Sequence, residues 1–320
     1  IRIQGQLNVA AFQQSCNEIV RRHEVLRTRF AIAQGRPVQS IRPTLHLSIP
    51  VIDLQPLSSP LKEQETQRLA QQEAQSSFDL TQGPLLRVCL LQVDTNEHVL
   101  FFTLHHIIAD GWSVSIILRE LAILYEAFIH GKPSPLPELA IQYADFAIWQ
   151  RQWLNPSDPS QGNSLYDKQL TYWQAQLAGE LTVLTLLNQK PRPAVQTFHG
   201  AVHAFTVSKS LTRDLKTLSY ATDTTLFMLL LTAFKVLLHR YSGQTDLIVG
   251  APVANRNRSE IEGLIGFFVN TLVLRTQLEG DPTFRTLLDR LRTVALEAYA
   301  NQELPIEKLV ESIHHQRDLS

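Results

Sequence analysis

Two long apolar runs lie close together in the first half of the chain, at residues 85–93 and 99–106. Both are rich in Leu, Val and Phe, and both carry apolar side chains at odd and even positions alike. Because successive side chains of a strand point to opposite faces, such runs indicate central strands that are covered on both sides. Helical patterns alternate with strand patterns along both halves of the sequence. The sequence therefore predicts an α/β fold.

The chain has 320 residues, about twice the length of a typical domain, which predicts two lobes. A segment containing Pro191 and Pro193 has the composition of a linker. We therefore expect an N-terminal lobe over residues 1–179, a linker over residues 180–200 and a C-terminal lobe over residues 201–320.

Capping residues and apolar spacing predict several individual elements. Asn8 is a suitable N-cap for a helix that reaches about His23, and Ser113 is a suitable N-cap for a later helix. Residues 201–207 have the pattern of the first strand of the second lobe. Residues 224–241 are apolar on nearly all sides, which predicts a buried helix.

Charge and cysteine content exclude several classes of protein. Lys and Arg number 29, Asp and Glu number 30, and the net charge is -1. Nucleic-acid and anionic-membrane binding both need a basic excess, so neither is expected. Cys16 and Cys89 are too few for a disulfide framework or a multi-thiolate zinc site, and no apolar run is long enough to span a bilayer. These features predict a cytoplasmic protein.

The strongest signal for chemistry is Leu-His-His-Ile-Ile-Ala-Asp-Gly-Trp-Ser at residues 104–113. On a strand, His105 and His106 point to opposite faces and cannot easily share one metal ion. One imidazole can then face a cleft while the other is held inside the lobe. Gly111 permits a tight turn after the strand and leaves Asp110 at that turn. A histidine beside a carboxylate, with an ordinary pKa of ~6.5, suits proton transfer near neutral pH.

The same residues also have a purely structural interpretation. It consists of a core histidine bonded to a backbone carbonyl and an Asp110 carboxylate paired with an arginine, because buried carboxylates need a partner. The sequence contains none of the usual motifs of serine hydrolases, P-loop enzymes, dinucleotide oxidoreductases or zinc proteases. The other histidines are scattered, so no metal site is predicted.

Residues 105–111 resemble the HHxxxDG signature of condensation domains in non-ribosomal peptide synthetases. Four further segments resemble other blocks of that family, in the family's order: RHExLRTxF at residues 22–30, YxDFAxW at 143–149, IGxFVNTxxxR at 265–275 and, more loosely, HQDxPFE at 301–307. The family's opening block, built around S-x-A-Q-x-R, is missing, and further residues are expected after Ser320. We therefore expect a chain truncated at both ends, with an incomplete second lobe.

The resemblance implies a fold like that of chloramphenicol acetyltransferase, with two α/β lobes in a V around a central channel. It also implies three partners: an upstream donor carrier protein, a downstream acceptor carrier protein and an adjacent adenylation domain. Substrates would arrive as thioesters on phosphopantetheine arms, and the domain itself would bind no cofactor. The acceptor amine would attack the donor thioester and form a peptide bond. The sequence around Asp145 and at residues 267–271 is similar to that of the family branch that joins an L-configured donor to an L-configured acceptor.

The resemblance also implies roles for the residues of the motif. His106 is expected to face the channel and to accept the amine proton, or to orient the amine and stabilise the charged intermediate. Gly111 is expected to supply a backbone N–H near the developing oxyanion. His105 and Asp110 are expected to fix the geometry of the loop.

Other residues are expected around this centre. The carboxylate of the motif is expected to pair with Arg27 or Arg256, and the sequence does not choose between them. Asn270, Trp112 and Ser113 are expected to line the substrate channel. For Asn270 a structural alternative is a strand-end amide that satisfies backbone groups.

Two other functions remain open at this point. One is an epimerising sibling that shares HHxxxDG and inverts the α-carbon of a bound aminoacyl group. The other is a non-catalytic platform that docks carrier proteins or a partner enzyme. The intact histidines, aspartate and glycine of the motif favour the catalytic interpretation.

Overall fold

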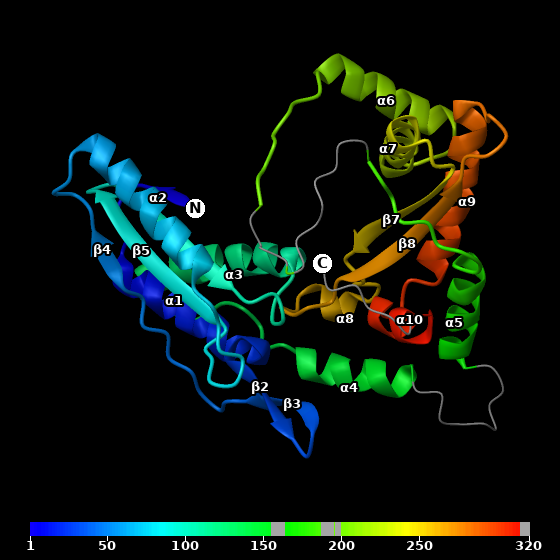
Figure 1. Ribbon diagram of the computed structural model, residues 1–320. Coiled ribbons are helices and arrows are strands. Elements are labelled where there is room, and N and C mark those ends of the chain that lie inside the picture. The colour runs from blue at the N-terminus through cyan, green and yellow to red at the C-terminus, as the bar shows by residue number, and fades with distance from the viewer. Residues whose placement is uncertain (155–163, 187–194, 196–199, 314–320) are drawn as a thin grey trace. The chain divides into compact units, whose positions relative to one another are not determined.

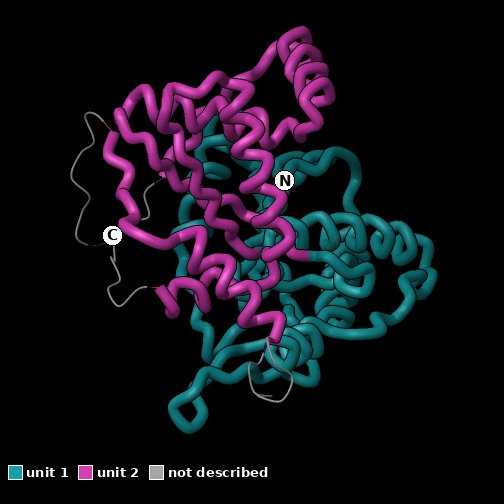
Figure 2. The backbone as a smooth tube through the Cα atoms, turned by 90° about the vertical axis from the view of Figure 1, so that its right-hand side faces the viewer, with its two compact units in different colours: residues 1–153, 256–269 teal, residues 154–255, 270–320 magenta. Residues whose placement is uncertain are grey.

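The computed structural model describes residues 1–154, 164–186, 195 and 200–313. The chain forms two compact units, drawn in different colours in Figure 2. Unit 1 contains Ile1–Trp153 and Arg256–Val269, and unit 2 contains Leu154–Asn255 and Asn270–Ser320. The segment at residues 256–269 therefore belongs to unit 1, although the chain on both sides of it belongs to unit 2.

This division differs from the predicted boundary at residue 179. Helix α5 (Leu165–Gln176) belongs to unit 2 because its Trp173 is 2% exposed and packs in the core of that unit. The indole Nε1–H of Trp173 also donates to the carbonyl of Asn301 at 2.9 Å. The predicted linker at residues 180–200 lies largely outside the described residues.

Unit 1 is built on a four-stranded sheet in the order β1-β6-β5-β4. Its strands are β1 (Arg2–Gln4), β4 (Val51–Asp53), β5 (Leu86–Asp94) and β6 (Glu97–Leu104). Strands β5 and β6 pair antiparallel in the centre, β1 pairs antiparallel with β6, and β4 pairs parallel with β5. The prediction that the two apolar runs form central strands is confirmed.

Helices cover both faces of this sheet, as the apolar runs predict. Helices α1 (Val9–Arg22) and α3 (Gly111–Ile129) pack together, and their core includes Val88 and Leu90 of β5. Helix α2 (Ser59–Gln75) lies on the other face, where its Leu69 packs in a cluster with Leu91 and Val93 (Figure 1). Odd and even positions of β5 therefore serve different cores.

The remaining elements of unit 1 are short. They are a 3-10 helix η1 (Glu24–Arg27), a separate hairpin of β2 (Thr28–Ala33) and β3 (Arg36–Ile41), and helices α4 (Tyr143–Trp153) and α8 (Ser259–Glu262).

Two predicted helix caps have different outcomes. The side chain of Asn8 accepts the N–H of Ala11 at 3.0 Å, so the predicted cap of α1 is confirmed. The predicted cap of α3, Ser113, is wrong. Asp110 is the N-cap, and its Oδ1 accepts the N–H of Ser113 at 2.8 Å. Asp is as good an N-cap as Ser, and it stands three residues earlier.

Unit 2 pairs β7 (Asp246–Val253) with β8 (Asn270–Gln277) in an antiparallel sheet. Besides α5, its helices are α6 (Lys209–Ala221), α7 (Leu226–Ser242), α9 (Phe284–Ala300) and α10 (Ile306–Ile313). The strand predicted at residues 201–207 is wrong, because the structure has no regular element there.

Helix α7 is buried on one face only. Met228, Leu229 and Leu238 are buried, as predicted for a core helix. Its other face carries large apolar side chains that are 42–60% exposed within the described residues: Phe227, Leu230, Phe234, Leu237 and Tyr241. The prediction of a buried helix therefore holds for about half of its circumference.

The buried face of α7 also carries Lys235, whose side chain is 0% exposed. Its Nζ donates to the carbonyls of Leu247 at 3.3 Å and Leu274 at 2.7 Å, and to Oγ1 of Thr276 at 2.6 Å. One ammonium thus fastens α7 to both strands of the sheet. Burial lowers the pKa of Lys235 to about 7, against a smaller opposing effect of Asp246.

No single helix in the described part of the chain is long and apolar enough to cross a membrane. Helices α6 and α7 meet the length and composition criteria only as a pair, and they are bent by 104° at the break between them.

Candidate active site

The HHxxxDG segment of unit 1 runs from the end of β6 into the first turn of α3. Strand β6 ends at Leu104, so the strand alternation used in the sequence analysis does not reach the histidines. The N–H of His105 donates to the carbonyl of Leu85 at 2.9 Å. Its carbonyl accepts the N–H of Ile108 at 3.1 Å, which closes a turn. This turn, rather than a strand, separates the directions of the two imidazoles.

His105 supports that turn. Its ring is partly buried, and its Nδ1 accepts the backbone N–H of Ile107 at 3.0 Å. A nitrogen that accepts a hydrogen bond carries no proton, so the neutral ring has its proton on Nε2. The ring also lies at right angles to Phe78, with centroids 5.9 Å apart. These contacts fit the predicted supporting role.

His106 is exposed, in contrast to its neighbour. Its imidazole packs edge to face against Phe267, with centroids 5.1 Å apart and an interplanar angle of 89°. The imidazole has no hydrogen bond to any other described residue. Both ring nitrogens are therefore available to a substrate.

Asp110 is the buried centre of the site, with its side chain 3% exposed. Its Oδ1 accepts bonds from the N–H and the hydroxyl of Ser113 at 2.8 and 2.7 Å, and its Oδ2 accepts the N–H of Phe268 at 3.1 Å. Burial acts to raise the pKa of Asp110. The bonds from Ser113 and Phe268 and the charge of Arg256 outweigh burial, and the pKa is lowered. The carboxylate therefore stays ionised.

Arg256 is the arginine that pairs with Asp110, at 3.2 Å. Its Nη1 also donates to the carbonyls of Ile261 and Leu264, both at 2.7 Å, and its guanidinium lies 4.0 Å from the ring centroid of Phe268. The ion pair thus ties the segment at residues 256–269 to the start of α3.

Arg27, the other predicted partner, is bonded elsewhere in unit 1. Its guanidinium donates to the carbonyl of Arg42 and to the carboxylate of Glu24. The structure therefore resolves the alternative that the sequence leaves open.

Ser113 is buried, and the prediction that it lines a channel is wrong. Its side chain is 0% exposed, and its hydroxyl lies 2.7 Å from Oδ1 of Asp110 and 2.9 Å from the carbonyl oxygen of Gly266. The hydroxyl also accepts the N–H of Gly266 at 3.0 Å. Trp112 is 47% exposed, and its indole Nε1–H donates to the carbonyl of Glu262 at 3.0 Å.

Gly111 is exposed at the first position of α3. Its φ is not positive, so the turn that Gly111 was expected to permit does not depend on the conformational freedom of glycine. A Cβ atom placed there would meet no atom within 4 Å. The chain itself therefore has room for a larger side chain at this position.

Asn270 belongs to unit 2 and is 6% exposed. Its Nδ2 donates to the carbonyls of Gln302 at 2.7 Å and Leu304 at 2.8 Å. Its Oδ1 accepts the N–H groups of Thr271 at 2.8 Å and Ile306 at 3.0 Å. Every polar position of the amide is used by backbone, so none is left for a substrate. The structural alternative, a strand-end amide, describes the observed contacts.

Sequence reasoning missed the contribution of Phe267 and of the residues that hold it. The hydroxyl of Tyr143 donates to the carbonyl of Phe267 at 2.9 Å. A Cβ atom at Gly266 would lie 2.2 Å from the ring of Tyr143, so glycine is required there. The available signal was the IGxFVNT-like block itself, since its glycine marks a close approach of backbone and side chain.

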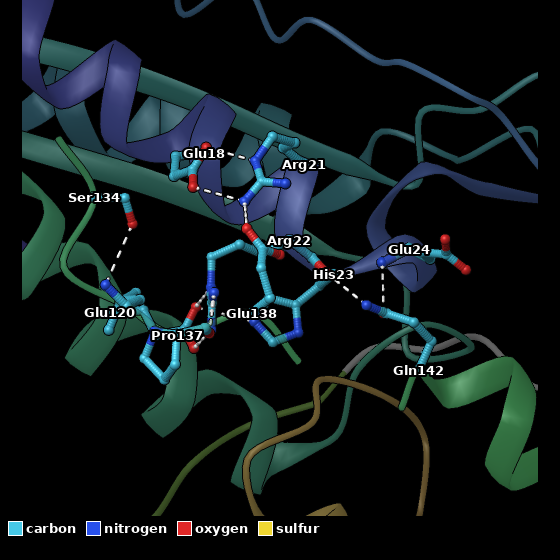
Figure 3. A network of polar contacts seen from close by, with 11 residues as sticks. Glu18, Arg21, Arg22, His23, Glu24, Glu120, Ser134, Pro137, Glu138 and Gln142 are labelled. Atoms are coloured by element: carbon cyan, nitrogen blue, oxygen red, sulfur yellow. Dashed lines mark hydrogen bonds and ion pairs between the residues drawn. The ribbon is translucent and has the colours of Figure 1, made fainter. Parts of the chain in front are cut away.

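A second buried network in unit 1 surrounds Glu120 of α3 (Figure 3). Its carboxylate lies 2.9 Å from Nε2 of His23 and 3.4 Å from Arg22. Arg22 also donates to the carbonyl of Pro137 at 2.7 Å, and its own carbonyl accepts a bond from Gln142 at 2.9 Å. Burial acts to raise the pKa of Glu120, but the bonds from His23 and Arg22 lower it overall. The RHE-like block is therefore structural.

No group of three or more His, Cys, Asp or Glu side chains suited to a metal ion occurs among the residues that the structure describes.

The model of the condensation domain family matches residues 1–320. The chain belongs to the condensation domain family. It is 50% identical to a linear gramicidin synthase protein of Brevibacillus parabrevis over 320 residues, which are 100% of this chain and 6% of that protein. It is 44% identical to chondramide synthase cmdD of Chondromyces crocatus over 318 residues, which are 99% of this chain and 8% of that protein. The chain thus spans a small fraction of these relatives.

Similar solved structures also point to the condensation domain family. The crystal structure of the X-domain from teicoplanin biosynthesis matches with a TM-score of 0.90 and 29% identity, over 100% of this chain and 69% of that chain. The first condensation domain of the calcium-dependent antibiotic synthetase matches with a TM-score of 0.80 and 20% identity, over 99% of this chain and 72% of that chain. At that identity the second match supports the fold alone. The fold is therefore the α/β fold of condensation domains.

Proposed function

We propose that this condensation domain joins two carrier-bound substrates by a peptide bond in non-ribosomal peptide synthesis. The observation that carries the proposal is His106, an exposed imidazole without a hydrogen bond among the described residues, in the turn between β6 and α3 of an intact HHxxxDG segment. The similarity to linear gramicidin synthase supports the same reaction class.

In this reaction the free α-amine of the acceptor attacks the thioester carbonyl carbon of the donor. A carbon–nitrogen bond forms and the carbon–sulfur bond breaks. The amine loses one proton, and the pantetheine sulfur of the donor leaves and is protonated to a thiol. The peptide ends on the acceptor arm.

The chemistry makes modest demands on the protein. An α-amine has an ordinary pKa of ~7.7–8.0, so an appreciable fraction is neutral near pH 7. Holding two tethered reactants in line can supply about 7–11 kcal/mol in ideal cases. His106 then accepts the amine proton, or orients the amine and stabilises the charged intermediate.

The other motif residues assist in different ways. Gly111 contributes a backbone N–H to the developing oxyanion, which its place at the N-terminus of α3 favours. His105 and Asp110 act through geometry, as their contacts with backbone support. The exposed face of Trp112 borders the path of the substrate.

The proposal extends to partners and setting. The domain works between an upstream donor carrier and a downstream acceptor carrier, beside an adenylation domain, and joins an L-configured donor to an L-configured acceptor. It takes phosphopantetheine as part of its substrates and holds no cofactor of its own. A cytoplasmic setting is supported by Cys16 and Cys89, both free thiols.

A docking platform is the second candidate. It is favoured by one match, the complex of the X-domain and OxyB from teicoplanin biosynthesis, with a TM-score of 0.88 and 28% identity. A pure docking surface gains nothing from an exposed imidazole without a hydrogen bond among the described residues, so we place this candidate second.

One experiment separates the candidates. The full-length protein that carries this chain is incubated with both loaded carrier proteins, and the thioesters are released and analysed by chiral mass spectrometry. Condensation gives a dipeptidyl thioester on the acceptor carrier. Inversion of one aminoacyl group without a new bond would identify the epimerising sibling. Unchanged aminoacyl groups on both carriers would favour the platform.

A further inference from the structure

The backbone on either side of Phe267 is fixed by the buried residues of unit 1. The carbonyl of Gly266 accepts the N–H of Asp110 at 3.1 Å, and the N–H of Gly266 donates to Oγ of Ser113 at 3.0 Å. On the other side, the N–H of Phe268 donates to Oδ2 of Asp110 at 3.1 Å. The residues on both sides of Phe267 are therefore anchored to Asp110 and Ser113, at the start of α3.

The carbonyl of Phe267 is held as well, by the Tyr143 hydroxyl at 2.9 Å. The ring of Phe268 is 2% exposed, with the ring of Phe146 at 4.7 Å between centroids and the guanidinium of Arg256 at 4.0 Å. Phe267 differs from Phe268 in being 36% exposed. Its backbone is as constrained as that of a core residue, but its ring reaches the surface.

At that surface the ring meets His106, with centroids 5.1 Å apart and planes at 89°. This is the arrangement that aromatic pairs prefer. An exposed side chain with no hydrogen bond ordinarily samples several rotamers. A rigidly held aromatic ring at one side removes some of these rotamers and leaves both imidazole nitrogens open.

We infer that Phe267 is a positioning residue that selects the working rotamer of His106. The inference rests on the proposed function, in which His106 acts on the acceptor amine. The Asp110–Arg256 pair then influences the imidazole through residues 266–268 and the ring of Phe267, rather than through a bond to the imidazole. This explains why a buried ion pair accompanies an exposed histidine that it does not touch.

The test compares Phe267→Leu with Phe267→Tyr and with Phe284→Leu in the full-length protein. Phe284 is the matched control, because it is 41% exposed and begins α9 in unit 2. Loss of positioning should lower kcat about tenfold or more, since small misplacements of catalytic groups cost up to ~100-fold. The KM for the loaded acceptor carrier should change little. Phe267→Tyr, which keeps the ring, should retain the wild-type kcat, and Phe284→Leu should have no effect.

A second readout follows the imidazole directly. The rate at which diethyl pyrocarbonate modifies His106 is measured by peptide mass spectrometry, with the exposed His203 as internal standard. Removing the ring should raise the rate at His106 several-fold and leave His105 unchanged, which shows that the turn is intact. If Phe267→Leu lowers the melting temperature, Phe267→Met, whose flexible side chain fills the space differently, replaces it.

The outcomes are distinguishable. Unchanged kcat and an unchanged His106 rate in Phe267→Leu, with His106→Ala inactive, would overturn the inference and leave the proposed function standing. No dipeptidyl product in the wild type would overturn the proposed function. The modification rate would then still decide whether Phe267 holds the imidazole.

Discussion

Arg256 in unit 1 and Lys235 in unit 2 are both buried cations, but they have different partners. In unit 1 the side chain of Arg256 is 1% exposed and meets the carboxylate of Asp110. In unit 2 Lys235 is 0% exposed, and among the described residues its Nζ donates only to neutral oxygens, two carbonyls and one hydroxyl. The nearby carboxylate of Asp246 is paired with Arg275 at 2.6 Å instead.

The difference in partners gives the two cations different effects: Arg256 orients the segments around it, whereas Lys235 holds a helix against the sheet. An ion pair with several bonds on each partner fixes directions, and in unit 1 it fixes the turn and the segment around Phe267. An ammonium among neutral acceptors holds elements together, but burial favours its neutral form and lowers its pKa. In unit 1 the ion pair lies beside a turn that carries an exposed imidazole.

The largest effect is expected when the pair in unit 1 loses its cation. Arg256→Leu leaves the Asp110 carboxylate buried without a partner, which typically costs about 3–5 kcal/mol of unfolding free energy. Chemical denaturation measures this loss. Arg27→Leu is the control, because Arg27 contacts Glu24 and a carbonyl but not Asp110. Equal losses in both variants would show that the buried pair has no special weight.

A smaller, pH-dependent effect is expected for the cation in unit 2. The pKa of Lys235 is about 7 in the folded chain and ~10.4 when unfolded, so the unfolded chain binds more protons between these values. Stability relative to Lys235→Met should therefore rise with pH, by about 1 kcal/mol per pH unit between pH 7 and 9. Thermal unfolding across this range measures the slope, with the exposed Lys216→Met as control. A flat difference would mean that Lys235 keeps its proton and that the two buried cations behave alike.

The smallest effect on stability is expected at Gly111. A Cβ atom meets nothing within 4 Å there, so Gly111→Ala should change the unfolding free energy by less than about 1 kcal/mol. Dipeptide formation should nevertheless fall, because a substrate that approaches this backbone N–H would meet the new methyl group. Gly263→Ala, at another position of unit 1 with open space, is the control. Full activity of Gly111→Ala would remove the proposed approach of substrate to this N–H.

Short sequence patterns predicted the features that depend on neighbouring residues in the chain. The apolar runs identified both central strands, and Asn8 identified the start of α1. The HHxxxDG segment indicated a supporting His105 and an exposed His106, although through a strand argument that the structure replaces with a turn. The order of residues within such a ten-residue segment is enough to indicate which histidine supports the turn and which is exposed.

Contacts between segments that are far apart in the sequence could not be predicted from such short patterns. The burial of Ser113 depends on Gly266, and that of Asn270 on the chain that leads into α10. Neither residue differs in local sequence from an exposed polar side chain at the end of an element. The choice of Arg256 over Arg27 likewise depends on where the segment at residues 256–269 returns to unit 1.

The central claim is that the exposed imidazole of His106 carries the reaction, while the buried residues around it only hold it. Single-turnover formation of dipeptidyl thioester by His106→Ala, with both carriers loaded, tests this most directly. We expect product formation to fall by about 100-fold or more, as for loss of a general base, with an unchanged melting temperature. Wild-type product formation in that variant would contradict the account.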